Sequence, residues 1–210
     1  MTTVIFDLDG TLVDSSADIA ASINHVRAEY YGLEPLTREK IVYLMNRPGL
    51  NLAYEFYGVK EYETKAREMF EEHYSRQCLL NARTFEGIYE MLETLKNGGA
   101  RMFVATNAPT ATSEIILKNN AIDLFFEDVI GADKVEYPKP HPQMVEKIVE
   151  KISKKSCWMV GDSPKDIMAA TGAGIAPIFA GWGFAKDTQP DIKIDRRADT
   201  PSDVIDIIGV

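Results

Sequence analysis

Phe6-Asp7-Leu8-Asp9-Gly10-Thr11-Leu12 is the stretch of this 210-residue sequence that decides its fold. The residues just before Asp7, Thr3 to Phe6, form an apolar run without alternation, which is typical of a strand buried on both faces of a parallel sheet. A carboxylate at the carboxyl end of such a strand faces the crevice in which open α/β sheets bind ligands. Gly10 then allows a tight turn.

The two aspartates of this stretch, Asp7 and Asp9, are separated by a single residue. Two neighbouring carboxylates repel each other unless a cation or a shared proton holds them. Mg²⁺ prefers oxygen ligands and often bridges one or two carboxylates to a substrate phosphate. The pattern therefore favours a divalent metal site over a turn in which the aspartates act only as caps.

The second half of the chain alternates between strand and helix patterns. Apolar runs predict further strands, and amphipathic stretches between them predict helices; the strands are expected at 102–105, 126–131, 158–160 and 176–179, and the helices at 88–95, 110–119, 142–152 and 164–172. Repeated strand and helix units with short loops predict an α/β fold with a parallel, doubly wound, Rossmann-like sheet.

Helical patterns alone fill the chain between the first strand and this second half. They are expected to begin at Ser15 or Ser16, which can cap a helix, and to continue at 37–45, 50–57 and 62–78. This block is too long for a simple crossover helix. The sequence therefore predicts a small α-helical domain, residues 15–83, inserted into an α/β core formed by residues 1–14 and 84–210.

Polar residues follow three further elements of the predicted core. Thr106 and Asn107 end a strand and can donate hydrogen bonds to a phosphoryl oxygen, although strand-end residues of these types are often only turn residues. Lys139 lies in a proline-rich loop that fixes where its ammonium points. Asp162 ends another strand, and Asp166 follows one helical turn later. All are expected to converge with Asp7 at one edge of the sheet.

Four motifs together resemble those of the haloacid dehalogenase superfamily, and in particular its phosphoglycolate phosphatase-like subgroup with a helical cap. They are Asp7-x-Asp9-Gly-Thr, the threonine Thr106 after an apolar strand, Lys139-Pro-x-Pro, and Gly-Asp162-Ser-x-x-Asp166. A segment after the last predicted strand, Gly181-Trp182-Gly183-Phe184, also resembles a part of that subgroup, with an aromatic loop plug as the alternative.

The resemblance implies a role for each of these residues. Asp7 would be the nucleophile that forms an aspartyl-phosphate, and Asp9 the general acid and base. Lys139 would hold Asp7 and the phosphoryl oxygens, with Thr106 and Asn107 as further substrate-binding residues. Mg²⁺ would be held by a carboxylate oxygen of Asp7, the backbone carbonyl of Asp9 and the side chain of Asp162. For Asp166, an ion pair with Lys139 or a contact with its own helix N-terminus is favoured over metal ligation.

Arg47 is the cation that the sequence offers for substrate selection. It lies between a predicted helix and Pro48-Gly49, and Asn46-Arg47-Pro48-Gly49 only loosely resembles the first cap loop of the subgroup. A guanidinium can bind a substrate carboxylate or a second phosphate through two hydrogen bonds. The alternative is an arginine at a helix end that contacts only solvent.

The function implied by the resemblance is that of a Mg²⁺-dependent phosphatase. It would hydrolyse a small phosphate monoester, such as a phosphoglycolate-like metabolite, through the aspartyl-phosphate. A sugar-phosphate mutase would use the same Asp7 and Asp9 but return the phosphoryl group to its substrate, and a non-catalytic binding protein could keep the fold. A dehalogenase is disfavoured because it would need neither Asp9 nor the metal.

Composition narrows the range of partners. The formal net charge of −9 argues against nucleic acid, whose phosphates require a basic surface. The sequence lacks an apolar run long enough to span a membrane and a basic start typical of a signal peptide, so a cytoplasmic location is expected. Cys78 and Cys157 are expected to be buried thiols. The expected partner is a small phosphorylated metabolite, and the oligomeric state stays open.

Overall fold

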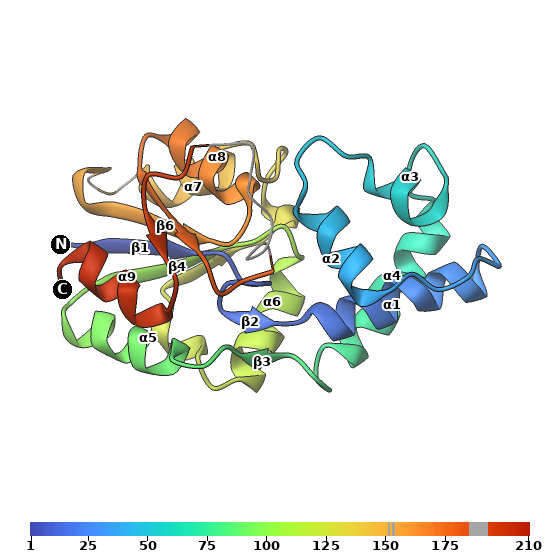
Figure 1. Cartoon of the computed structure of the whole chain (residues 1–210), viewed down its shortest axis with the longest axis horizontal. Coiled ribbons are helices and arrows are strands. Elements are labelled where there is room, and N and C mark those ends of the chain that lie inside the picture. Colours follow the sequence, from blue (N-terminus) through green and yellow to red (C-terminus); the bar gives the residue numbers. More distant parts are fainter. Residues whose placement is uncertain (151, 153, 185–192) are drawn as a thin grey trace.

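The computed structural model describes residues 1–150, 152, 154–184 and 193–210, and within them a parallel six-stranded sheet forms the centre of the molecule (Figure 1). The strand order is β5-β4-β1-β6-β7-β8. The strands are β1 (Thr3–Phe6), β4 (Arg101–Ala105), β5 (Asp128–Ile130), β6 (Cys157–Gly161), β7 (Ala176–Ala180) and β8 (Arg197–Ala198). Phe6 of β1 pairs with Val104 on one side and Val160 on the other, so β1 lies between strands that extend the sheet in opposite directions. Ligands bind at such a reversal of strand order.

Helices cover both faces of the sheet. One face carries α5 (Ile88–Asn97), α6 (Thr110–Asn119) and α9 (Pro201–Ile208), and the other carries α7 (Gln143–Val149) and α8 (Pro164–Ala173). Strand β1 therefore buries every side chain: Val4 and Phe6 join one apolar cluster and Ile5 joins the other. Full burial of an aliphatic or aromatic side chain contributes about 1.5–3 kcal/mol. This two-sided burial is the reason that the sequence of β1 shows no polar alternation.

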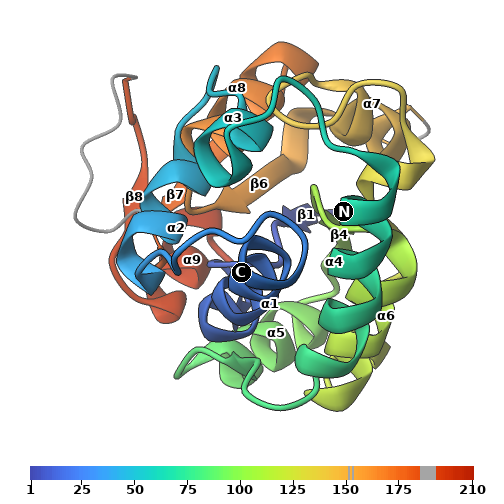
Figure 2. The same ribbon diagram turned by 90° about the vertical axis from the view of Figure 1, so that its right-hand side faces the viewer.

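The predicted insertion consists of helices α1 (Ser16–Glu29), α2 (Arg38–Asn46), α3 (Leu52–Tyr57) and α4 (Thr64–Gln77). Figures 1 and 2 show these helices together at one end of the molecule, beyond the carboxyl ends of the central strands. An antiparallel ribbon of β2 (Val13–Asp14) and β3 (Arg83–Thr84) lies where the chain passes from the core to these helices and back. This placement supports the division at residues 14 and 84, which stays a prediction.

Several short elements were not expected from the sequence. Strands β2, β3 and β8 have two residues each, and helix α9 follows the last predicted strand. Helix α9 did carry a signal, because Thr200 and Asp203 form a capping box around Pro201 at the first turn. Three 3₁₀ turns complete the described elements: η1 (Asp123–Phe125), η2 (Ala132–Lys134) and η3 (Lys154–Ser156).

Two expectations from composition can be compared with the structure. Cys78 and Cys157 are both buried, as predicted. Within the part of the chain that the structure describes, no helix is both long enough and apolar enough to pass through a bilayer.

Candidate active site

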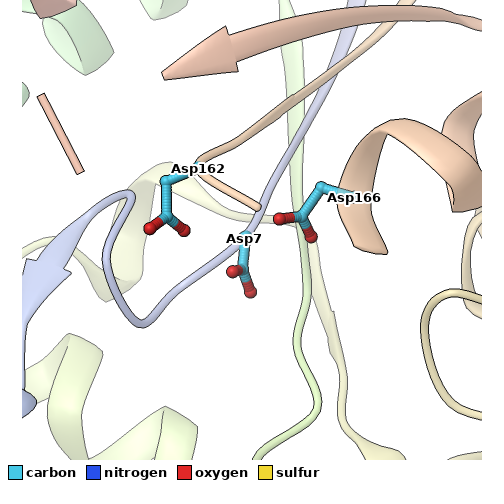
Figure 3. A group of neighbouring side chains, drawn as sticks. All are labelled: Asp7, Asp162 and Asp166. Carbon is cyan, nitrogen blue, oxygen red and sulfur yellow. The ribbon is translucent and has the colours of Figure 1, made fainter. Parts of the chain in front are cut away.

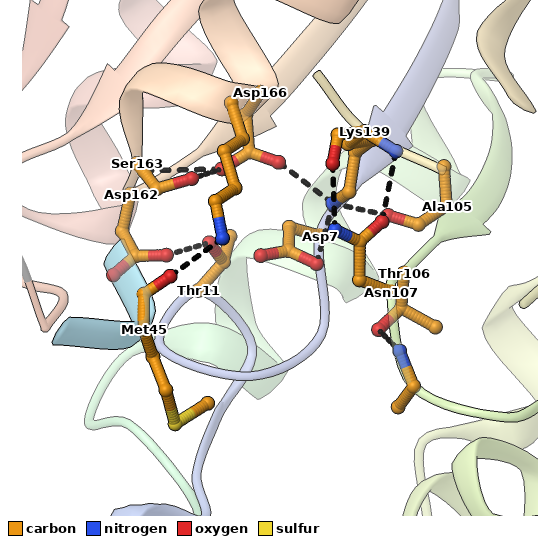
Figure 4. Close-up of polar contacts among 12 residues, drawn as sticks. Asp7, Thr11, Met45, Ala105, Thr106, Asn107, Lys139, Asp162, Ser163 and Asp166 are labelled. Carbon is orange, nitrogen blue, oxygen red and sulfur yellow. Dashed lines mark hydrogen bonds and ion pairs between the residues drawn. The ribbon is translucent and has the colours of Figure 1, made fainter. Parts of the chain in front are cut away.

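A buried lysine holds two carboxylates together at the carboxyl edge of the sheet (Figure 4). The Nζ atom of Lys139 donates to Oδ1 of Asp7 at 2.7 Å, to Oδ1 of Asp166 at 2.6 Å and to the carbonyl oxygen of Ala105 at 2.7 Å. An ammonium has three N–H donors, so these bonds use all of them. Asp7 follows β1, Ala105 ends β4 and Asp166 lies in the first turn of α8, so Lys139 joins three elements of the core.

The burial of this cluster shifts the ionisation of its members. Burial raises the pKa of Asp7 to about 7; Asp166 and Asp9 act in the same direction, and Lys139 opposes them. Burial also raises the pKa of Asp162 well above its usual range, with further contributions from Asp7 and Asp166. For Lys139, burial acts to lower the pKa, but the Asp166 and Asp7 carboxylates outweigh it and raise the pKa. Because a raised pKa favours the neutral form of a carboxyl group, the single charge of Lys139 does not fully offset the burial and mutual repulsion of Asp7 and Asp162.

Asp9 is held by a serine at the start of α1. Oγ of Ser15 donates to Oδ1 of Asp9 at 2.5 Å. Burial raises the pKa of Asp9, while the hydrogen bond from Ser15 and the charge of Lys139 act to lower it. Ser15, one of the two serines expected to cap the helix, occupies the N-cap position of α1 but makes no side-chain hydrogen bond to the helix. Its hydroxyl contacts Asp9 instead.

Asp162 is fixed by two loops. Oγ1 of Thr11 donates to its Oδ1 at 3.3 Å, and the backbone N–H of Phe184 donates to its Oδ2 at 2.8 Å. Gly10 has φ +89°, and a Cβ atom at that position would lie 2.5 Å from Oδ2 of Asp162. Only glycine allows this approach. Nε1 of Trp182 donates to the carbonyl oxygen of Thr11 at 2.9 Å, so the loop after β7 supports the turn after Asp9.

The carboxylates of Asp7, Asp162 and Asp166 form a group that can hold a metal ion (Figure 3). One oxygen from each lies within 4.8 Å of the others, and all three residues are buried. Hard carboxylate oxygen donors suit Mg²⁺. Asp166 is also engaged by its own helix, because its Oδ2 accepts hydrogen bonds from the N–H and the hydroxyl of Ser163. The predicted ligands Asp7 and Asp162 both belong to this group, and their role as ligands stays a prediction; the carboxylate of Asp9 is outside the group found among the described residues.

Thr106 and Asn107 both line the cavity beside Asp7, as their positions at the end of β4 predict. Oγ1 of Thr106 accepts a hydrogen bond from the N–H of Ala108 at 3.1 Å, which leaves its own hydroxyl hydrogen available to a ligand. The side-chain amide of Asn107 bonds the backbone of Lys139 in both directions, at 2.8 and 2.9 Å. Asn107 thus positions the lysine loop, and its contact with a phosphoryl group stays a prediction.

The cavity above these residues has a volume of about 270 Å³ and reaches the predicted cap. Its core wall includes Asp7, Asp9, Thr106, Asn107, Lys139, Ser163, Lys165 and Asp166, and its cap wall includes Ile19, Met45, Asn46, Leu52, Phe70, Glu71 and Tyr74. Lys165 was not expected in the site, and Nζ of Lys165 donates to the carbonyl oxygen of Met45 at 2.6 Å. Its signal was its place between Asp162 and Asp166 in the fourth motif.

Arg47 lies away from the carboxylate cluster. Its side chain is exposed, and it is outside the set of residues that line the cavity. Arg47 is the C-cap of α2, and its guanidinium turns back one helical turn, where it bonds the hydroxyl of Tyr43 and lies 5.2 Å from the centre of that ring. Arg47 does not line the cavity formed by the described residues, and its role as a substrate clamp stays a prediction.

Comparison with known proteins agrees with the motifs. The profile of the family described as haloacid dehalogenase-like hydrolase matches residues 4–180. The chain is 30% identical over 207 residues to the pyrophosphatase PpaX of Bacillus mycoides, covering 94% of each chain. It is also 30% identical over 206 residues to a phosphoglycolate phosphatase of Agrobacterium fabrum, covering 92% of this chain and 88% of the relative.

Solved structures show the same fold. A protein described as a predicted phosphoglycolate phosphatase of Haemophilus somnus superposes with a TM-score of 0.81 at 28% identity, covering 99% of this chain and 97% of the other. CbbY of Rhodobacter sphaeroides, crystallised with phosphate, gives 0.82 at 20% identity, covering 97% and 96%, and this likeness concerns the fold alone. With the family profile spanning most of its length and its motif residues gathered at one edge of the sheet, the chain belongs to the haloacid dehalogenase-like hydrolase family.

Proposed function

We propose that this protein is a Mg²⁺-dependent phosphatase that hydrolyses a small, phosphoglycolate-like phosphate monoester through an aspartyl-phosphate on Asp7. The observation that carries the proposal is the buried contact of Lys139 with Asp7, at the base of a cavity that Asp9 also lines. The relatives named as phosphatases support the reaction class. The cytoplasmic location expected from the sequence remains part of the proposal.

In the first step, a carboxylate oxygen of Asp7 attacks phosphorus. A bond forms between that oxygen and phosphorus while the bond from phosphorus to the leaving oxygen breaks. The carboxylic acid of Asp9 gives its proton to the leaving oxygen. Burial supports this role because it raises the pKa of Asp9 and so favours the protonated form, and the hydrogen bond from Ser15 orients the group.

In the second step, the ionised Asp9 accepts a proton from a water molecule. The water oxygen attacks phosphorus, the bond between phosphorus and Asp7 breaks, and inorganic phosphate leaves. Asp9 is then protonated again and Asp7 is again a carboxylate. One residue thus serves as acid in the first step and as base in the second.

The charge balance of the site explains the expected need for a metal. Mg²⁺ would be held by a carboxylate oxygen of Asp7, the backbone carbonyl of Asp9 and the side chain of Asp162. When bound, it would offset the repulsion between the nucleophilic carboxylate and the phosphate. Lys139 supplies a fixed positive charge on the other side of Asp7, and the hydroxyl of Thr106 can donate to a phosphoryl oxygen.

The proposal is tested by phosphate release. A panel of small phosphate monoesters is incubated with the protein, with Mg²⁺ and with EDTA, and inorganic phosphate is measured. We expect release that depends on Mg²⁺. Rearrangement of a sugar phosphate without phosphate release would indicate the mutase alternative, and the absence of any turnover of an aryl phosphate would indicate a binding protein.

A further inference from the structure

The two lysines that line the cavity differ in how many of their N–H donors are used. Lys139 donates its three N–H groups to Asp7, Asp166 and the Ala105 carbonyl. Lys165 makes one hydrogen bond, to the carbonyl oxygen of Met45. Among the described residues no carboxylate forms an ion pair with Lys165, so its partner is a neutral group. Two of its donors remain for a ligand.

The position of Lys165 places these donors between the core and the cap. Lys165 lies in the first turn of α8, directly before Asp166, and Met45 lies at the end of α2. Figure 4 shows the Met45 carbonyl that receives its hydrogen bond, on the side of the site that carries Asp162 and Ser163. The hydrogen bond keeps the long side chain extended across the boundary, which reduces the entropy that a ligand would have to remove.

We propose that Lys165 binds a second anionic group of the substrate, a carboxylate or a second phosphate on the leaving-group side, and so selects substrates with two anionic ends. This assignment rests on the proposed phosphatase function, and it identifies Lys165 as the residue that binds the non-reacting end of the substrate. Lys165 is partly buried, and no carboxylate partner among the described residues offsets the cost of removing its charge from water. An anionic ligand would supply that partner.

The rest of the cavity wall bears on where the second anionic group of the substrate binds. On the cap side, Met45, Leu52 and Phe70 are apolar, and the hydrogen-bond donors are neutral: the Asn46 amide nitrogen and the Tyr74 hydroxyl, both without a partner among the described residues. Glu71 of α4 also lines the cavity and repels a negative group. Lys165 is therefore the cavity cation that can meet an anionic end of the substrate on the cap side, with the amide of Asn46, next to Met45 in α2, as a further neutral donor.

A matched pair of substrates separates this role from a purely structural one. Phosphoglycolate and 2-hydroxyethyl phosphate differ only in whether the second end is a carboxylate or a hydroxymethyl group. For Lys165→Met we expect the ratio of kcat/KM for phosphoglycolate to that for 2-hydroxyethyl phosphate to fall roughly tenfold to a hundredfold, the loss expected for one charge-assisted interaction. Lys165→Arg, which keeps the charge, should retain most of the ratio.

Lys96→Met is the control for the loss of one positive charge. Lys96 is an exposed lysine on α5 whose Nζ also donates to a backbone carbonyl, that of Leu124, and it is outside the cavity. This variant should keep the wild-type ratio. If Lys165→Met lowers kcat/KM equally for both substrates, or for neither, Lys165 is only a contact between core and cap and the proposal is overturned.

Pyrophosphate carries a second phosphate where phosphoglycolate carries a carboxylate, and its kcat/KM is also compared with that for 2-hydroxyethyl phosphate. If Lys165→Met lowers this ratio for pyrophosphate only, Lys165 binds a second phosphate. If it lowers the ratio for phosphoglycolate only, Lys165 binds a carboxylate.

Binding to the wild-type protein gives a test that depends neither on the variants nor on turnover. By titration calorimetry with Mg²⁺ present, phosphonoacetate should bind at least about ten times more tightly than ethylphosphonate. Equal affinities overturn the role of Lys165 whether or not the protein is a phosphatase. Tight binding of phosphonoacetate without hydrolysis of any ester would instead refute the proposed function while supporting the site.

Discussion

The ammonium nitrogen of Lys139 lies 2.7 Å from Oδ1 of Asp7, although 132 positions of the chain separate the two residues. This contact fixes the orientation of the proposed nucleophile before any substrate is present. It also makes Asp7 part of a buried charge cluster, so substitutions here are expected to affect stability as well as catalysis.

Asp7→Asn is expected to reduce phosphatase turnover by at least about a thousandfold, because the amide cannot serve as the covalent nucleophile. Its shape is close to that of the native side chain, and its amide oxygen can still accept a hydrogen bond from Lys139. Circular dichroism should therefore show a folded protein. A folded variant that retains near-normal turnover of an aryl phosphate would contradict the assignment of Asp7.

Lys139→Met is expected to lower the free energy of unfolding by roughly 3–5 kcal/mol, because it leaves two buried carboxylates without their cation. Urea denaturation at neutral pH measures the change. The double variant with Asp166→Asn should lose less than the sum of the two single losses, since Asp166 is one of the charges left unpaired. Additive losses would mean that Lys139 and Asp166 are not energetically coupled.

Asp9→Asn is expected to slow both formation and hydrolysis of the aspartyl-phosphate, because one carboxyl group serves both steps. Rapid-quench measurements with an aryl phosphate follow leaving-group release and phosphate release separately. Ser15→Ala provides the comparison: it removes the hydrogen bond to Asp9 but keeps the carboxyl group, so its effect on both rates should be smaller. A variant of Asp9 in which only one of the two steps slows would refute the shared role.

Asp162→Ala is expected to weaken Mg²⁺ binding, so that activity lost at low Mg²⁺ returns in part at high Mg²⁺. The measurement is a titration of initial rate against Mg²⁺ concentration for the variant and the wild type. The midpoint should move to higher concentration for the variant. Identical midpoints would exclude Asp162 as a metal ligand.

Asp162→Asn is expected to stabilise the metal-free protein at pH 8. The folded-state pKa of Asp162 is raised by burial, so the folded protein binds protons more tightly than the unfolded chain. The stability of the wild type in EDTA should therefore fall as pH rises from the pKa of an unfolded aspartate through the raised folded-state pKa of Asp162, and each kcal/mol corresponds to roughly 2–4 °C in Tm for a chain of this size.

Melting curves in EDTA at pH 5.5 and pH 8 test the predicted direction of this change in stability with pH. The variant should melt above the wild type at pH 8, and the difference should narrow at pH 5.5. Added Mg²⁺ should raise the Tm of the wild type more than that of the variant, because ligand binding to the folded state stabilises it. A variant that melts below the wild type at pH 8 in EDTA would show that the Asp162 carboxylate is not a source of strain.

The arrangement of the core could be predicted from sequence because its strands are buried on both faces. Each such strand appears as a short apolar run, β1, β4 and β6 are followed by a polar residue, and parallel strands end at the same edge. The structure does bring Asp7 and Thr106 to one cavity, places Asp162 within 4.8 Å of Asp7 through their carboxylate oxygens, and brings Lys139 beside Asp7.

Contacts that depend on side-chain direction could not be predicted. Arg47 turns back onto Tyr43, and Lys165 reaches the Met45 carbonyl, although both are cations beside a proline in the sequence. The two-residue strands β2 and β3 have no periodicity of their own, since they exist only through pairing with each other. The hydroxyl of Ser15 could equally have capped its helix, and only the fold decides that it contacts Asp9.

The β2–β3 ribbon has a consequence for how this protein can change over evolution. Val13 pairs with Thr84 and Asp14 with Arg83, so the chain leaves the core and re-enters it at adjacent points. A segment attached in this way can grow, shrink or be exchanged while the register of the central sheet stays the same. Mutation can therefore alter the part of the cavity wall contributed by α2 and α4 without disturbing Asp7 or Lys139. New substrate preferences are thus accessible through changes that leave the reacting groups in place.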